Sequence, residues 1–509
     1  MAQLNIDNNC EYDLYARRWA RVRAINNGEA RLKEIDLKRV SGLNTQVTTV
    51  SQAVSVSFLR PINPSNTSAY NQNRNVNMIN GARLYNATVK TLSGLLGMLY
   101  RKPPVESEVP AELEYIFKNV NGAGLSMNQQ SRSVSSDVVS IGRDGLLVDM
   151  PRNDKGVQIT KADVDAGFRA TIQEYKAESI IDWHETVLNN AKVLDLIVLK
   201  EQVEVYADEM RIKRDIKNQF KVYRLKADGV TVQIFTEDEN GSGSTVIQTD
   251  EVGVTDSSGA KMKNIPFTFV GSMNNQPGID NLPLEPISDI NIGHYQESAN
   301  LASSSFQLSA CQPWVADDSF AKIAQDKAKN GGSVELGEDS LIVLKAGGTF
   351  NLTAPPENTM SRGIQKDYEE QMIALGAQLI TTGGMAETAE AARIKHASDV
   401  SDLQVISSNI SEAYTQCIEW VCLMMGIDYK DYSYTLNDEF FDSNLSAEDA
   451  VKLVGIWQGG AISKDVLDRK LVQGKLISDD VDLDDMNTVI AEEQASSIDF
   501  DEDEVVVAE

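Results

Sequence analysis

Two periodic segments on either side of Gly383 dominate the hydrophobic pattern of the chain. In the first, apolar side chains recur with helical spacing, at Ile364, Tyr368, Met372, Leu375 and Leu379. In the second, a similar stripe runs from Ile394 to Met424 without an interrupting proline. At about 1.5 Å per residue this second helix is roughly 60 Å long, whereas the usual helix of a globular domain has about 11–12 residues. The pattern predicts a helix, a short break and a very long helix that spans layers of a larger assembly.

The remaining pattern separates helical parts from a β-rich part. The first 150 residues are predicted to be mainly helical, with a polar loop or arm over residues 40–78 and one helix from Ile79 to Leu99. Alternating β-branched residues between 194 and 270 predict an antiparallel β-rich layer. A further helix opens at Pro286, and residues 311–357 form a compact insert of strands and one short helix. The overall fold class is therefore α+β.

The helix that opens at Pro286 has small side chains at its centre. Ser298, Ala299, Ala302 and Ser305 lie within one stretch of it. Small side chains let a neighbouring helix approach closely, so we expect this stretch to pack against copies of the same chain. A mildly polar surface helix is the alternative, and periodicity alone does not separate the two.

Composition favours an assembly component over an enzyme. The chain has 509 residues, more than the roughly 250–300 at which a single core stops growing, so at least two domains are expected. The net charge of −28 argues against a protein that grips nucleic acid by bulk attraction. The four cysteines lack metal-type spacing and are expected to be reduced. Neither a signal peptide nor an apolar run of about 20 residues is found, which predicts a soluble protein without a membrane partner.

The sequence contains no recognisable set of catalytic residues. The histidines, His184, His294 and His396, are too scattered to predict a metal centre or a catalytic triad. Asp144 and Asp149 could pair as carboxylates, but a turn that enters a strand explains their segment better. Phosphate-binding loops and nucleophile elbows are absent from the sequence. We therefore expect no enzymatic activity, no cofactor and no metal.

Several short motifs, in this order along the chain, resemble the portal proteins of tailed bacteriophages, also called head-to-tail connectors. Those of the first half are Phe58–Pro61, Asn86–Gly97, Arg101–Pro104 and Gly142–Asp149. Those of the second half are Asn291–Tyr295, Ala374–Ala377 and Glu387–Ala389. The order of elements, with the broken helix pair after a compact insert, is similar as well. The resemblance covers roughly residues 10–475.

This resemblance implies a ring at one capsid vertex, usually a dodecamer, with a channel through which double-stranded DNA is packaged and ejected. It also implies a portal-like division of the chain. The implied regions are the wing (residues 1–280), two stem helices (284–310 and 358–380), the clip (311–357), the tunnel loop (381–388), a long wing helix (389–426), and the crown with an acidic tail (427–509).

The resemblance further implies partners and a location. During packaging the clip meets the large subunit of the terminase motor, and afterwards it meets head-completion and tail adaptor proteins. The major capsid and scaffolding proteins surround the ring. The expected location is the portal vertex of the virion, after assembly in the host cytoplasm.

The resemblance places the sites along the helix pair. The tunnel loop would comprise Thr381, Thr382, Gly383, Gly384 and Met385. On the preceding helix, Arg362 and Lys366 are the expected contacts with DNA phosphates, although a solvated helix face explains them equally well.

Two other classes of protein compete with this interpretation. One is a minor capsid or head-morphogenesis protein without a DNA channel, and the other is a β-rich hydrolase with added helices. The broken helix pair argues against the first class. The missing catalytic residues argue against the second.

Overall fold

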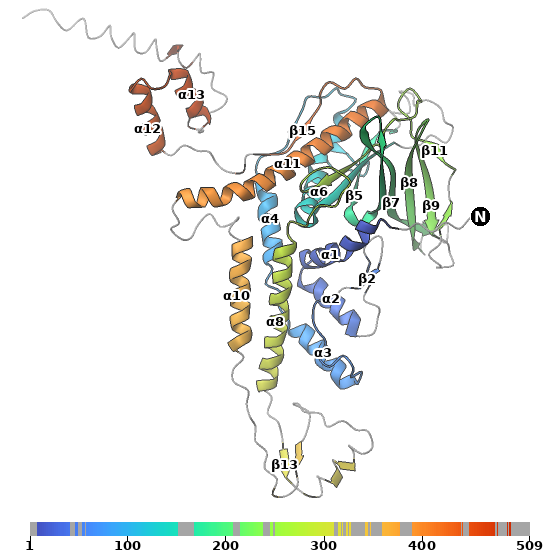
Figure 1. Cartoon of the computed structure of the whole chain (residues 1–509), viewed down its shortest axis with the longest axis vertical. Coiled ribbons are helices and arrows are strands. Elements are labelled where there is room, and N and C mark those ends of the chain that lie inside the picture. Colours follow the sequence, from blue (N-terminus) through green and yellow to red (C-terminus); the bar gives the residue numbers. More distant parts are fainter. Residues whose placement is uncertain are drawn as a thin grey trace, which may run out of the picture. The chain divides into compact units, whose positions relative to one another are not determined.

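The structure is a computed structural model in which the chain forms two compact units, Met1–Asp438 and Glu439–Glu509. It describes residues 8–40, 46–48, 53–55, 57–150, 167–206, 214–237, 245–247, 250–309, 314–316, 318, 322–323, 325–326, 342–344, 347, 359–376, 389–438, 440, 447–473, 476, 486 and 488–489. Helices and mainly antiparallel sheets are mixed (Figure 1), which confirms the mixed α and β composition expected from the sequence.

The helices of the first unit lie before and after a β-rich middle. The early helices are α1 (Cys10–Asn26), α2 (Glu29–Val40), α3 (Ala69–Gly81), α4 (Ala87–Leu99), α5 (Glu114–Lys118) and α6 (Met127–Ile141). The later helices are α8 (Glu285–Ser309), α10 (Thr359–Leu375) and α11 (Ala389–Met425). The 37 residues of α11 confirm the very long helix predicted after the break.

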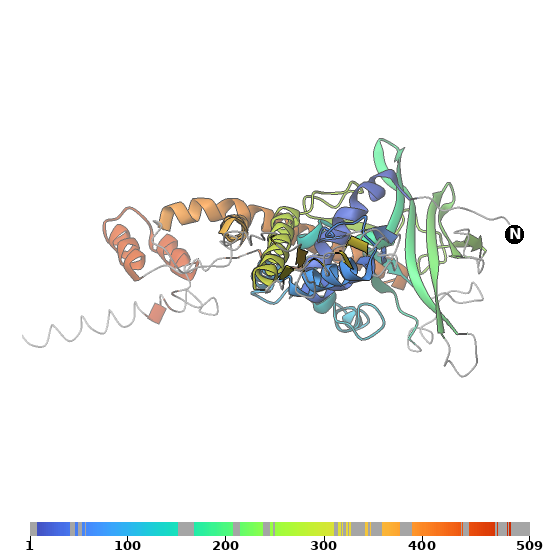
Figure 2. The same cartoon turned by 90° about the horizontal axis from the view of Figure 1, so that it is seen from below.

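The strands form one large sheet and several small ones. The large sheet has the antiparallel order β10-β9-β8-β7-β6, with β11 also paired to β9. Its strands are β6 (Ile180–Leu188), β7 (Ala191–Tyr206), β8 (Arg214–Lys226), β9 (Gly229–Glu237), β10 (Thr245–Ile247) and β11 (Val252–Gly253). This sheet confirms the antiparallel layer predicted from the alternating residues (Figure 2).

A second sheet has the order β12-β4-β5, and the remaining strands form pairs. Its strands are β4 (Arg143–Asp149), β5 (Thr171–Lys176) and β12 (Phe267–Gly271), with the short 3-10 helix η1 (Ala177–Ser179) after β5. The pairs are β1 (Gln46–Thr48) with β2 (Ala53–Ser55), β3 (Val105–Glu106) with β15 (Tyr434–Thr435), and β13 (Trp314–Ala316) with β14 (Ile342–Leu344). The β13–β14 pair is parallel and falls in the predicted compact insert.

One predicted helix is wrong in its extent. The helix expected from Ile79 to Leu99 is two helices, because α3 ends at Gly81 and α4 begins at Ala87. Ala82 adopts an extended backbone (ψ 145°), which ends the helical path. Apolar side chains continue at helical spacing across the break, so periodicity did not reveal it. The polar segment before it also contains the N-terminal part of α3.

The C-terminal part of α11 is a core helix of the first unit. It packs against α6, β4, β12 and β15, through the buried residues Leu403, Ile406, Ile410, Tyr414, Cys417, Ile418 and Val421. Burial raises the pKa of Cys417 far above its usual value, so the thiol stays protonated and acts as a small apolar group. The described cysteines Cys10, Cys417 and Cys422 form no disulfide, in agreement with the reduced state predicted from the sequence.

The second unit contains two described helices that pack against each other, α12 (Ala447–Gln458) and α13 (Lys464–Gln473). Leu467 is buried, while Val451 and Ile456 remain exposed. Across the described parts of both units, none of the helices combines the length and apolar character that crossing a membrane requires.

Replacing Ile410 by Ala should destabilise the first unit by about 2–5 kcal/mol, because Ile410 is fully buried and its truncation leaves a cavity. Val405→Ala on the same helix is the control, since Val405 is 38% exposed, and it should change stability by less than about 0.5 kcal/mol. Urea unfolding followed by circular dichroism measures both. Equal effects of the two substitutions would contradict the core position of α11.

Candidate functional site

The candidate site is the helix pair α8 and α10, which lie side by side in both views (Figures 1 and 2). The contacts run in opposite directions along the two helices. Ile287 of α8 meets Gly376 just beyond α10, whereas Gly293 meets Tyr368 further back. The helices are therefore antiparallel.

Two glycines allow the close approach in this pair. A side-chain carbon added at Gly293 would lie 3.0 Å from Cζ of Tyr368, and one added at Gly376 would lie 2.6 Å from Cδ1 of Ile287. Both distances are shorter than ordinary van der Waals contact. A methyl group at either position would force the facing side chain to shift, so glycine permits the close approach that is observed.

The motif Asn291–Tyr295 organises α8 against its neighbours. Asn291 is fully buried and accepts hydrogen bonds from the amide and hydroxyl of Thr88 at 3.3 and 3.0 Å. Its amide donates to the carbonyl of Tyr85 at 2.6 Å. His294 Nε2 lies 3.3 Å from a carboxylate oxygen of Glu369 on α10. The polar side chains of Asn291 and His294 thus join α8 to different segments.

Ion pairs tie the first turns of α8 to α1. Arg18 forms a two-point contact with the Glu285 carboxylate, and Arg21 donates to Asp289 at 2.7 Å. The hydrogen bonds to Glu285 raise the pKa of the Arg18 guanidinium above its usual value, so the side chain stays charged. The two acidic residues are four positions apart, so they lie on one face of α8. Sequence reasoning missed this contact, because the partners are more than 260 residues apart.

Arg362 and Lys366 lie where the sequence placed them, on α10, and both are exposed. A spacing of four residues puts them on one flank of the helix, away from the buried Ser361 and Met372. Within the described residues neither cation forms an ion pair. Their side chains are therefore accessible to an anionic partner, and their contact with DNA stays a prediction.

The small-residue stretch needs a correction for two of its four residues. The Ser298 hydroxyl accepts a hydrogen bond from the Arg83 amide at 2.9 Å, and Ala299 belongs to a core cluster built with α1, α2 and α3. The chain covers these two side chains itself, so a neighbouring copy cannot contact them. Ala302 packs close to Gly81 and is half-buried, and Ser305 is exposed. Packing between subunits through these last two stays a prediction.

Thr381, Thr382, Gly383, Gly384 and Met385 lie outside the described residues. The described chain ends at Gly376 after α10 and resumes at Ala389 with α11. The tunnel-loop interpretation therefore stays a prediction.

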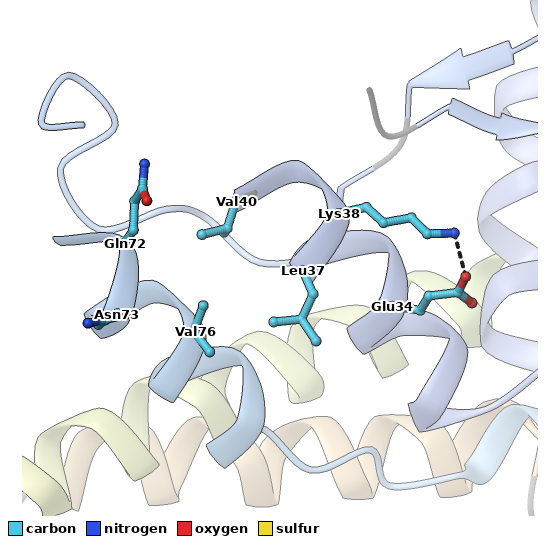
Figure 3. A pocket seen from close by; sticks show the side chains of 7 residues that line it. All are labelled: Glu34, Leu37, Lys38, Val40, Gln72, Asn73 and Val76. Atoms are coloured by element: carbon cyan, nitrogen blue, oxygen red, sulfur yellow. Dashed lines mark hydrogen bonds and ion pairs between the residues drawn. The ribbon is translucent and has the colours of Figure 1, made fainter. Parts of the chain in front are cut away.

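A pocket of about 400 Å³ lies between α2 and α3 (Figure 3). Its apolar lining comes from Leu37, Val40 and Val76, and Glu34 and Lys38 form an ion pair at its edge. Paired in this way, the two charges largely neutralise each other. The Lys38 amine is engaged in this ion pair, and the other lining residues offer no nucleophile, so the pocket gives no support to a catalytic function.

A paired-carboxylate site at Asp144 and Asp149 is not formed. The two residues are five positions apart on β4, so their side chains point to opposite faces of the sheet. Asp149 lies 3.5 Å from Lys221 on β8. Asp144 instead faces Asp137 and Glu174, residues that the sequence analysis did not single out.

A protein-family model described as a domain of unknown function, DUF4055, matches residues 283–424. The matched segment begins just before α8 and ends within α11, so it contains the helix pair, the insert between its members and nearly all of the long helix. A search of curated proteins gives no match. The family match therefore coincides with the candidate site but assigns it no activity.

Gly376→Ala should destabilise the helix pair by about 1–3 kcal/mol, because the added methyl group would overlap Ile287 and also crowd the short, buried side chain of Thr91. Gly363→Ala is the matched control on α10. An added methyl there meets no atom within 4 Å, and the helix should gain up to about 1 kcal/mol. Urea unfolding compares them. If both substitutions stabilised the protein, the close packing at Gly376 would be wrong.

Proposed function

We propose that this chain is the subunit of a phage portal: a ring-shaped channel at one capsid vertex through which double-stranded DNA is packaged and ejected. The observation that carries the proposal is the antiparallel pair α8 and α10, followed by the 37-residue α11. The motifs that resemble portal proteins lie at the contacts of this pair, notably Asn291–Tyr295.

The uncovered faces of α10 support assembly with further copies. Among the described elements its main neighbour is α8. Met360, Ile373 and Leu375 are 77%, 43% and 53% exposed, although all three are large and apolar. In a closed ring each α10 would contact a neighbouring subunit through a heterologous interface, which would remove these side chains from water.

The charge of the chain supports a channel that does not retain DNA. With a net charge of −28, the chain repels phosphate overall. Arg362 and Lys366 would supply a few local contacts, next to the acidic Asp367 and Glu370 on the same helix. In the proposed ring, Thr381–Met385 form the tunnel loop at the bore. A duplex held by few contacts can slide, since each phosphate contact adds salt-dependent affinity.

The insert between the paired helices would dock the partners. It contains the parallel pair β13 and β14, and in this proposal it is the clip that meets the terminase large subunit and later the head-completion and tail adaptor proteins. The major capsid and scaffolding proteins would contact the outside of the ring. The proposed location is the portal vertex of the virion.

Electron microscopy of the purified full chain tests the proposal directly, and we expect rings with an axial hole. Ile373→Glu should lower the fraction of rings at least tenfold, because it adds a charge to an apolar surface at every subunit interface. Val187→Glu is the control, at an exposed apolar residue of the large sheet, and it should leave the rings intact.

Compact particles without a hole, at every salt and protein concentration, would favour the minor capsid or head-morphogenesis alternative. Mass photometry gives the subunit number independently of particle orientation. A strictly monomeric chain under all conditions would overturn the proposal.

Rings should bind duplex DNA weakly and without sequence preference. Replacing both Arg362 and Lys366 by Ala should reduce the slope of log affinity against log salt by about one for each phosphate that the variant can no longer neutralise. The control replaces Arg83 and Lys118, whose side chains are 70% and 76% exposed elsewhere in the first unit. Gel shifts with unrelated duplexes over a salt series measure both. Tight, sequence-dependent binding at moderate salt would contradict the passive channel.

A further inference from the structure

Three carboxylates from three different elements meet inside the first unit, and we call them the carboxylate cluster. Asp137 lies on α6, Asp144 on β4 and Glu174 on β5. One oxygen of each lies within 4.8 Å of those of the other two. Asp137 and Asp144 are buried and Glu174 is half-buried. Because like charges repel strongly at this distance inside a protein, ionising all three is costly unless neighbouring cations offset their charge.

The neighbouring cations do not balance the carboxylate cluster. Arg23 donates to both oxygens of Asp137, at 2.9 and 3.0 Å, and also pairs with Glu178. Lys176 lies 3.6 Å from the same Asp137. The cluster and Glu178 together contain four carboxylates, whereas Arg23 and Lys176 are two cations. If all six groups are ionised, two negative charges remain uncompensated. A single divalent cation supplies the missing charge.

A second, independent observation at the cluster is that one oxygen of Asp144 is buried without a hydrogen-bond partner among the described residues. Its side chain is fully buried. Oδ1 accepts a hydrogen bond from the amide of the next residue, Gly145, whereas Oδ2 receives none from any described residue. Burial raises the pKa of the Asp144 carboxyl well above its usual value, and repulsion from Glu174 and Asp137 raises it further. A cation beside Oδ2 would remove both penalties.

We propose that Asp137, Asp144 and Glu174 bind one divalent cation, and that Ca²⁺ fits them best. Two oxygens on one Ca²⁺ can be about 4.6–5.2 Å apart, twice the usual Ca–O distance, whereas Mg²⁺ limits them to about 4.0–4.2 Å. The three carboxylate oxygens lie within 4.8 Å of one another, and Ca²⁺, whose coordination geometry is flexible, accepts such an arrangement more readily than Mg²⁺, which demands a near-ideal octahedron. The Ser133 hydroxyl donates to Glu174 at 2.8 Å and holds that carboxylate in place.

The competing account is a cluster that stays neutral by keeping protons. In that case burial holds the pKa of the Asp144 and Glu174 carboxyls above their unfolded values. The folded state then binds more protons than the unfolded state, so stability falls as the pH rises above about 4. Added Ca²⁺ would change nothing. The two accounts therefore differ most clearly above neutral pH, where Ca²⁺ competes best with protons.

Isothermal titration of the EDTA-treated full chain with CaCl₂ at pH 8 tests the proposal. We expect one ion per chain and a rise of about 3 °C in the unfolding midpoint at a hundredfold excess over Kd. Asp144→Asn and Glu174→Gln should each weaken binding at least tenfold. Asp228→Asn is the control, an exposed carboxylate that pairs with Lys261, and it should bind as the unaltered chain does.

Circular dichroism in EDTA should show Asp144→Asn folded and at least as stable as the unaltered chain, because the amide carries no charge to bury. Absence of Ca²⁺ binding up to millimolar concentration would overturn the proposal and leave the protonated cluster. Binding that persists unchanged in both cluster variants would also overturn it, since the ion would then lie elsewhere. Neither result depends on whether the chain forms rings.

Discussion

The buried side chain of Asn291 fixes the rotation of α8, and the packing of the helix pair follows from that rotation. Its carboxamide makes three hydrogen bonds, two accepted from Thr88 and one donated to the Tyr85 carbonyl. Leaving such a buried group unpaired costs about 1–3 kcal/mol. A turn of the helix about its axis would break all three bonds. The helix therefore has one orientation in which the Asn291 carboxamide keeps its hydrogen bonds.

That orientation determines which neighbours the other residues of the motif Asn291–Tyr295 contact. Ile292 and Tyr295 enter the core cluster formed with α1, α2 and α3. Gly293 faces the ring of Tyr368, and His294 faces Glu369. The helix α10 thus depends on α8 for its position, while its other faces keep apolar side chains exposed. Under the proposed function, neighbouring subunits complete the packing that the chain begins.

The sequence predicted the elements with strong periodicity and missed the contacts made by residues far apart in the chain. The stripe on α11 and the alternation in β7, β8 and β9 are local signals, and the structure has both. The break between α3 and α4 was missed because apolar spacing continues across it. Ser298 and Ala299 were assigned to a subunit interface because the sequence does not show that Arg83 and the core cluster cover them. The carboxylate cluster joins α6, β4 and β5, so no spacing rule could have found it.

Charge acts differently at the surface and inside this chain. At the surface, the excess of acidic side chains is screened over about 8–10 Å in physiological salt, so it limits attraction to DNA without preventing close contacts. Arg362 and Lys366 can therefore attract a phosphate only when the duplex is already near, which is what a passive channel needs. In the interior there is little screening, so the carboxylates around Asp144 repel one another strongly. The proposed cation would offset this buried negative charge. It would leave unchanged the outer surface past which the duplex is proposed to slide.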